Sequence, residues 1–195
     1  MKKAFIVLFL ILAAIFSYKT FFSSHDEAAL NPLEALTIVA DLDALTSLDP
    51  AENFEFSGME MIANTYQRLL IKPSLEKEAF EEAIASQGSF SSDGKYLTFT
   101  LKRHLKFASG NPVRPQDVAF SFIRLAKIGK APAQILENLG WTPQNIHTKI
   151  KLEGEDRLTL EVDPRLPRDR TLSIFTALSL SIVDEKEALA HSPQD

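Results

Sequence analysis

The segment at residues 91–101 constrains the fold more than any other part of this chain. It opens with Ser-Ser-Asp-Gly-Lys, in which the Asp-Gly pair tolerates the positive φ angles that a tight turn requires. The residues that follow, 96–101, alternate in a period of two that is typical of a half-buried strand. The sequence therefore predicts a β-hairpin. In its second strand, the side chains expected to point inward are Phe99 and Leu101, and those expected outward are Thr98 and Thr100.

A helix is predicted to follow the turn Gly110-Asn111-Pro112. Pro115 suits the first helical position because its missing N–H would have no partner there, and Asp117 is favourably placed at the positive end of the helix. The helix is expected to run through Val118, Phe120, Phe122, Ile123 and Leu125.

A second hairpin is predicted near the end of the chain. Two strands, at residues 146–152 and 157–162, are joined by Glu-Gly-Glu-Asp, whose composition is typical of a turn. After them, residues 170–183 are mainly apolar, which predicts a mostly buried helix running into a strand or turn.

The first half of the chain predicts a mixed α/β order. A short β-branched run at residues 35–40 predicts a buried strand, and residues 57–70 predict a helix with one apolar face. That face would carry Met59, Ile62, Ala63, Tyr66, Leu69 and Leu70. Residues 75–85 form a second amphipathic stretch, in which four glutamates are interpreted as a solvated face.

The N-terminus predicts export from the cytoplasm. Lys2 and Lys3 precede an apolar run at residues 4–16, which has the charge and length of a secretory signal peptide. Residues 1–22 are accordingly a signal peptide or, because the cleavage site is poorly defined, an uncleaved anchor in the inner membrane. Polar and small residues at positions 23–31 predict a linker.

Composition excludes several classes of function. The chain has 195 residues, 21 basic against 26 acidic, so no positive field is available to gather the phosphates of a nucleic acid. It contains no cysteine, which excludes disulfides, thiolate metal sites, thiol nucleophiles and a lipoprotein anchor.

No residue pattern supports catalysis, a metal or a cofactor. The four histidines are scattered and lack the spacing of a metal pair, and Asp41 and Asp43 lack the further ligands of a calcium loop. The seven glycines form neither a phosphate loop nor a dinucleotide fingerprint, and no serine lies in a nucleophile elbow. The chain is therefore predicted not to be an enzyme.

An ordered constellation at residues 84–125 identifies a family. The hairpin leads through Lys106-Phe107, Gly110-x-Pro112 and Asp117-Val-Ala-Phe-Ser, and this order resembles the extracellular solute-binding proteins of peptide, dipeptide and nickel ABC transporters, family 5. Leu48-Asp49-Pro50 also looks like the opening of that family, and residues 181–186 look like its Ile-Val-Pro-Lys region.

The resemblance implies an α/β fold of the periplasmic binding protein type II class, present only in part. Residues 32–50 would hold the first strand of the larger lobe, residues 51–150 a small α/β lobe, and residues 151–195 the return to the larger lobe, which is truncated. Within the small lobe, Phe107 and Phe120 are expected to fill the core.

Three positions depart from the pattern of the family. Gly88 stands where a tryptophan is usual, His104 where a glycine is usual, and Ser109 where an aspartate is usual. Loss of a buried tryptophan would remove packing that stabilises a fold by roughly 2–4 kcal/mol, so these departures bear on function.

The resemblance also implies a site and partners. The segment that could line the cleft between the lobes follows Leu-Asp-Pro and consists of Asn53, Phe54, Glu55, Phe56 and Ser57. The expected function is that of a periplasmic solute-binding component of a peptide-type ABC importer, truncated and without function on its own. Its partners would be an oligopeptide or similar solute, the permease subunits and a separately encoded C-terminal lobe. The alternative is an exported interaction module that docks on a permease or another envelope protein without carrying solute.

Overall fold

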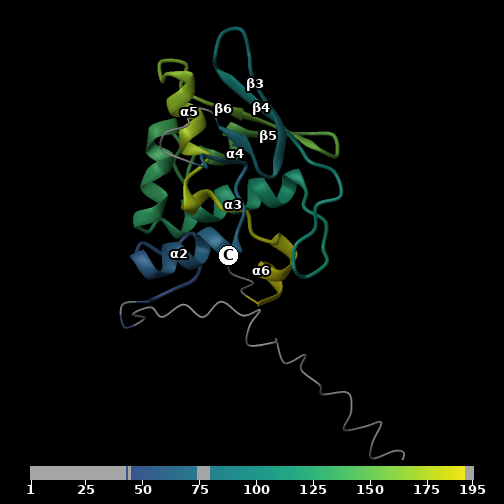
Figure 1. Ribbon diagram of the computed structural model, residues 1–195. Helices are drawn as coiled ribbons and strands as arrows, with labels where there is room; N and C mark the ends of the chain where they lie inside the picture. The colour runs from purple at the N-terminus through teal and green to yellow at the C-terminus, as the bar shows by residue number, and fades with distance from the viewer. Residues whose placement is uncertain (1–42, 44, 74–79, 192–195) are drawn as a thin grey trace, which may run out of the picture. The chain divides into compact units, whose positions relative to one another are not determined.

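The computed structural model describes residues 43, 45–73 and 80–191 (Figure 1). The signal segment, the linker and the strand expected at residues 35–40 lie outside the described residues, as do residues 75–79 of the amphipathic stretch.

A four-stranded antiparallel sheet forms the centre of the described part. Its strands are β3 (Ala85–Phe90), β4 (Tyr96–Leu101), β5 (Ile150–Glu153) and β6 (Arg157–Glu161), in the order β3-β4-β6-β5. Both predicted hairpins are therefore confirmed, although α4 (Ile146–Lys149) occupies the start of the second one. A two-residue strand, β1 (Leu70–Ile71), pairs separately with β2 (Glu81–Glu82).

The turn between β3 and β4 forms as its composition predicts. Gly94 has a φ of 72° and its N–H donates to the carbonyl of Ser91 at 3.0 Å. The Ser91 hydroxyl also accepts the N–H of Tyr96 at 3.0 Å, which fixes the start of β4. The turn sets the register of the two strands, and with it which side chains of β4 point inward. The predicted alternation is confirmed, because Leu97 and Phe99 are fully buried, whereas Thr98 and Thr100 are only partly buried.

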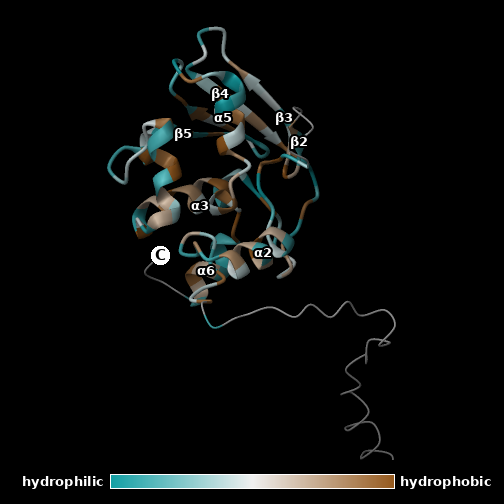
Figure 2. Ribbon diagram, turned by 60° about the vertical axis from the view of Figure 1, so that its left-hand side comes forward, coloured by the Kyte–Doolittle hydropathy of each residue, from teal (hydrophilic) through white to brown (hydrophobic). Residues whose placement is uncertain are grey.

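The buried face of the sheet packs on helix α3 (Pro115–Ile128), which carries hydrophobic residues along its length (Figure 2). Aromatic rings join the two layers: Phe99 of β4 meets Phe175 edge to face at 5.4 Å, and Phe175 lies 6.2 Å from Phe122 of α3. Trp141 is also buried against both Phe122 and Phe175, and its indole N–H donates to the carbonyl of Glu161 at 2.8 Å. These contacts define one continuous core.

Helix α3 begins where the sequence predicts and runs through Leu125, as expected, to Ile128. The Asp117 carboxylate accepts the backbone N–H of Arg114 at 2.8 Å, Pro115 occupies the first turn, and Gly129 ends the helix with a φ of 63°. The prediction that Phe120 fills the core is wrong, because Phe120 is only partly buried and lies outside the core cluster. Phe107 is also only partly buried, but it packs against that cluster, so the prediction for this residue is confirmed in part.

The predicted helix at residues 57–70 is shorter than expected and faces differently. Helix α2 spans Phe56–Thr65, and its buried residues are Gly58 and Ile62. Met59 and Ala63, which were expected on the buried face, are exposed. The predicted helix was too long because the apolar spacing in the sequence continues past the end of α2. Its last two positions, Leu69 and Leu70, are buried but follow the helix.

Short elements complete the described chain. They are the 3-10 helices η2 (Ala131–Leu139) and η3 (Leu178–Leu180) and the α-helices α5 (Arg168–Ile174) and α6 (Glu185–His191). The helix that was expected within residues 170–183 to run into a strand or turn is the helix α5, followed by the short 3-10 helix η3. The amphipathic stretch at residues 75–85 ends in strands, where Glu81 and Glu82 are exposed. The boundary expected between residues 150 and 151 stays a prediction, but β5 and β6 join the sheet of β3 and β4, which favours a boundary later in the chain.

Candidate functional site

The loop after Leu48 is built by Asp49, which folds the chain back on itself. The carbonyl of Asp49 accepts the N–H groups of Glu52 at 3.0 Å and Asn53 at 2.9 Å, and its carboxylate accepts the N–H of Ala51 at 2.9 Å. Pro50 fixes the backbone within this turn. The loop therefore has a defined shape before α2 begins.

The same carboxylate anchors the loop to α3. Arg124 donates from both terminal nitrogens to Asp49, at 2.9 and 2.6 Å, and the Arg124 side chain is nearly buried. A second, exposed ion pair joins Lys130 to Glu52 at 2.7 Å. The sequence does not predict the ion pair between Asp49 and Arg124, because no sequence rule pairs residues that are 75 positions apart. The aspartate in the Leu-Asp-Pro motif was the one sign of it in the sequence.

The five residues predicted to line a cleft fall into two groups. Asn53 is buried, and its side-chain amide donates to the carbonyl of Ser47 at 2.8 Å and to the carboxylate of Glu55 at 2.6 Å. Asn53 and Glu55 therefore shape the loop. Gly58 is required beside them, because a Cβ at that position would lie 1.9 Å from the Asn53 side-chain nitrogen. Ser57 is partly buried.

The two phenylalanines of this loop point into solvent. Phe54 is 60% exposed and Phe56 is 76% exposed. Leu48 and Met59 are also large and exposed, and we call these four residues the apolar surface. Exposed aromatic side chains in one short segment are unusual unless another molecule covers them.

A groove of about 800 Å³ lies between α6, the loop at residues 105–109 and the segment that follows α2. Leu48 and Asp49 also line it, so the groove begins at the base of the loop. Burial raises the pKa of Tyr66, and the adjacent Asp49 raises it further. This side chain is therefore a neutral hydroxyl group in the groove wall.

Acidic side chains hold α6 against α3 and the loop at residues 105–113. Burial acts to raise the pKa of Asp184, yet hydrogen bonds from Ser109 at 2.6 Å and Asn111 at 2.9 Å hold it below its ordinary value. Burial raises the pKa of Asp117, whose carboxylate also accepts the N–H of Glu185 at 3.2 Å.

The structure describes the surroundings of all three positions that depart from the family pattern. His104 has a φ of 63°, a left-handed conformation that favours the glycine usual at this position. Ser109 supplies the hydrogen bond to Asp184 just described. Gly88 is exposed and a Cβ there would lie 3.0 Å from the ring of Phe99, so Phe99 occupies the space next to it.

No metal site is present in the described part of the chain, where no three His, Asp or Glu residues are grouped suitably. Among the same residues, no helix has the length and hydrophobicity to cross a bilayer.

The fold matches part of the fold of periplasmic peptide-binding proteins of the type II class. An open, unliganded form of the murein tripeptide-binding protein MppA matches with a TM-score of 0.63 at 23% identity, covering 74% of this chain and 29% of that one. OppA of Listeria monocytogenes, solved bound to peptide, matches with a TM-score of 0.63 at 18% identity, covering 76% of this chain and 30% of that one.

The sequence identifies the family. The family described as bacterial extracellular solute-binding proteins, family 5 Middle, matches residues 79–195. The probable D,D-dipeptide-binding periplasmic protein DdpA of Escherichia coli (strain K12) is 40% identical over 167 residues, covering 84% of this chain and 30% of the relative. The dipeptide-binding protein DppE of Bacillus subtilis (strain 168) is 26% identical over 172 residues, covering 84% of this chain and 31% of the relative.

This chain belongs to the bacterial extracellular solute-binding proteins, family 5. It spans about 30% of the length of the relatives that it matches. The relatives are binding proteins and not enzymes, which confirms the interpretation of the sequence.

Proposed function

We propose that this chain supplies one wall of the solute-binding cleft in a periplasmic component of a peptide-type ABC importer. The observation that carries the proposal is the loop at residues 53–57, which is held by buried contacts and yet presents Phe54 and Phe56 to solvent. A binding loop requires a backbone that is held rigidly and side chains that are exposed to the ligand.

The family and the printed names of the relatives support a peptide as solute. DdpA and DppE are both named as dipeptide-binding proteins, and OppA was solved with bound peptide. The permease subunits of the importer, and the remaining lobe of the receptor, are the proposed protein partners.

We expect the single wall of the cleft that this chain supplies to bind a peptide weakly. A two-lobed receptor encloses its ligand, so its affinity comes from closure as well as from contact. The described residues cover only part of that fold, and a charged peptide end left in water gains little, about 0–1 kcal/mol, from an exposed ion pair. We therefore expect millimolar affinity, with no micromolar one-to-one binding in calorimetry.

Amide chemical shifts test the assignment of the loop. The ¹⁵N-labelled chain is titrated with a mixed di- to pentapeptide library at millimolar concentration, and shifts are expected to concentrate at residues 53–59. Phe56→Ser should weaken them, whereas Leu152→Ser, which removes an apolar side chain of 41% exposure from β5, should not. Shifts elsewhere, or none at all, would overturn the proposal.

A further inference from the structure

The apolar surface belongs to the most acidic segment of the chain. Between Lys19 and Arg68 the sequence contains nine Asp and Glu residues and no Lys or Arg. The whole chain has 21 basic residues, so their absence from this segment leaves the loop and α2 without cations of their own.

Two of the acidic side chains in this segment, Glu55 and Glu60, have no cationic partner among the residues that the structure describes. Asp49 and Glu52 are paired with cations of later elements, as described above. By contrast, the hydrogen bonds that the Glu55 carboxylate accepts within the described part of the chain come from two neutral groups, the Thr46 hydroxyl and the Asn53 amide. Glu60 is exposed, and among the residues that the structure describes no Lys or Arg lies within ion-pair distance of either carboxylate.

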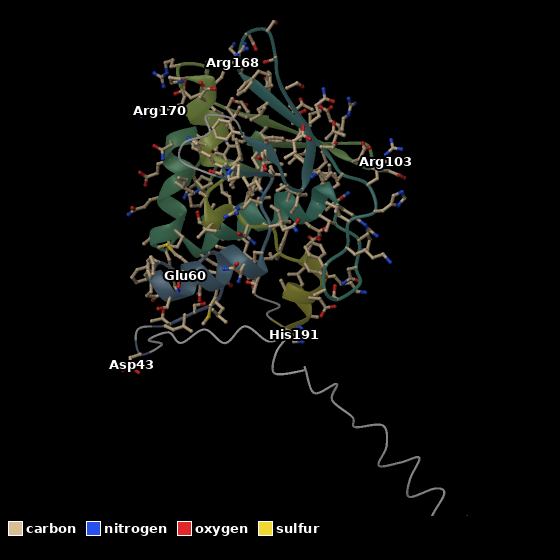
Figure 3. The ribbon with its side chains drawn as sticks, viewed as in Figure 1. Asp43, Glu60, Arg103, Arg168, Arg170 and His191 are labelled. Carbon is tan, nitrogen blue, oxygen red and sulfur yellow. The ribbon has the colours of Figure 1, made fainter. Side chains whose placement is uncertain are left out.

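Glu60 lies on the same face of α2 as an exposed aromatic ring. Phe56, Met59 and Glu60 are spaced by three and four residues, so they share one outward face of α2. Figure 3 shows Glu60 on the outer side of α2 and the labelled arginines, Arg103, Arg168 and Arg170, on other parts of the molecule. The face thus combines hydrophobic area with negative charge.

We propose that the apolar surface selects peptides in which a Lys or Arg lies next to an apolar residue, an inference that rests on the proposed function. The apolar residue covers the phenyl rings, while the cation lies between a ring face and a carboxylate. An ammonium or guanidinium is attracted by the face of Phe, and the aliphatic stem of its side chain packs on hydrophobic surface. An acidic peptide meets Glu55 and Glu60 without a counter-charge and is repelled.

Three tripeptides with the same free termini test this preference. The ¹⁵N-labelled full chain is titrated at low ionic strength with Lys-Phe-Lys, Gln-Phe-Gln and Glu-Phe-Glu, and the dissociation constants are taken from the shifts of residues 53–60. We expect Lys-Phe-Lys to bind about two to five times more tightly than Gln-Phe-Gln, with Glu-Phe-Glu weakest. The preference should shrink in 0.5 M salt, which screens exposed charges.

A matched pair of variants assigns the preference to this face. Glu60→Gln, an exposed substitution on the helix surface, should remove about half or more of the preference for Lys-Phe-Lys. Glu155→Gln removes the same charge from the exposed β5–β6 turn and should leave the preference unchanged.

The outcomes separate the inference from the function on which it rests. Equal affinity for the three tripeptides at residues 53–60 would overturn the charge preference and leave the cleft wall in place. Equal effects of Glu60→Gln and Glu155→Gln would show that net charge, and not this face, selects the peptide, and would also overturn the inference. Binding of none of the three would overturn both proposals.

Discussion

At the scale of single residues, Phe99 is central to the core of the described chain. It is fully buried in β4 and contacts Phe175 edge to face. Phe99→Ala should lower the free energy of unfolding by about 3–5 kcal/mol, because it removes a large side chain and leaves a cavity. Thr100→Ala, on the opposite face of the same strand, should lower it by under about 1 kcal/mol. Chemical denaturation of both variants measures the difference, and equal effects would show that the assigned faces are wrong.

His104 adopts a backbone conformation that a Cβ disfavours. A left-handed residue other than glycine carries about 1–2 kcal/mol of strain, partly offset because glycine makes the unfolded chain more flexible. We expect His104→Gly to raise the free energy of unfolding by about 0.5–1 kcal/mol. His104→Ala keeps the Cβ and is the control; a gain as large in that variant would attribute the effect to the imidazole and not to the backbone.

At the scale of secondary-structure elements, the ion pair between Asp49 and Arg124 joins the loop to α3. Arg124→Ala leaves the carboxylate of Asp49 partly buried without its partner, so we expect a loss of about 2–4 kcal/mol in unfolding free energy. Lys130→Ala breaks the exposed pair with Glu52 and should lose under about 1 kcal/mol. Denaturation curves compare the two variants, and a loss for Arg124→Ala no greater than for Lys130→Ala would contradict the anchoring role of Arg124.

The elements that depend on local chemistry were predictable from the sequence. The Asp-Gly turn set the register of β3 and β4, and Pro115 with Asp117 located the start of α3. Contacts between distant segments were not predictable. Periodicity placed Met59 on a buried face and the family resemblance placed Phe120 in the core, although Met59 is exposed and Phe120 is only partly buried. The family resemblance located the loop at residues 53–57, but the division between its structural and its exposed residues depends on how the chain turns at Asp49.

At the scale of the whole molecule, the prediction concerns the compartment. The N-terminal sequence has two lysines followed by an apolar run, and the relative DdpA is named as a periplasmic protein. A reporter fused after Ser24 should be active when it is of a type that works only outside the cytoplasm. Substitution of Leu8 and Leu10 by Arg within the apolar run is the control and should abolish that activity. Strong activity of a reporter that requires the cytoplasm, fused at the same residue, would contradict export.

The bidentate pair between Asp49 and Arg124 has a thermodynamic consequence for recognition. A flexible loop loses conformational entropy when a ligand orders it, and that loss is subtracted from the affinity. Here folding itself has already restricted the loop, because a helix of the core holds its first turn. The backbone that carries the aromatic side chains of the loop therefore loses little further conformational entropy when a molecule binds.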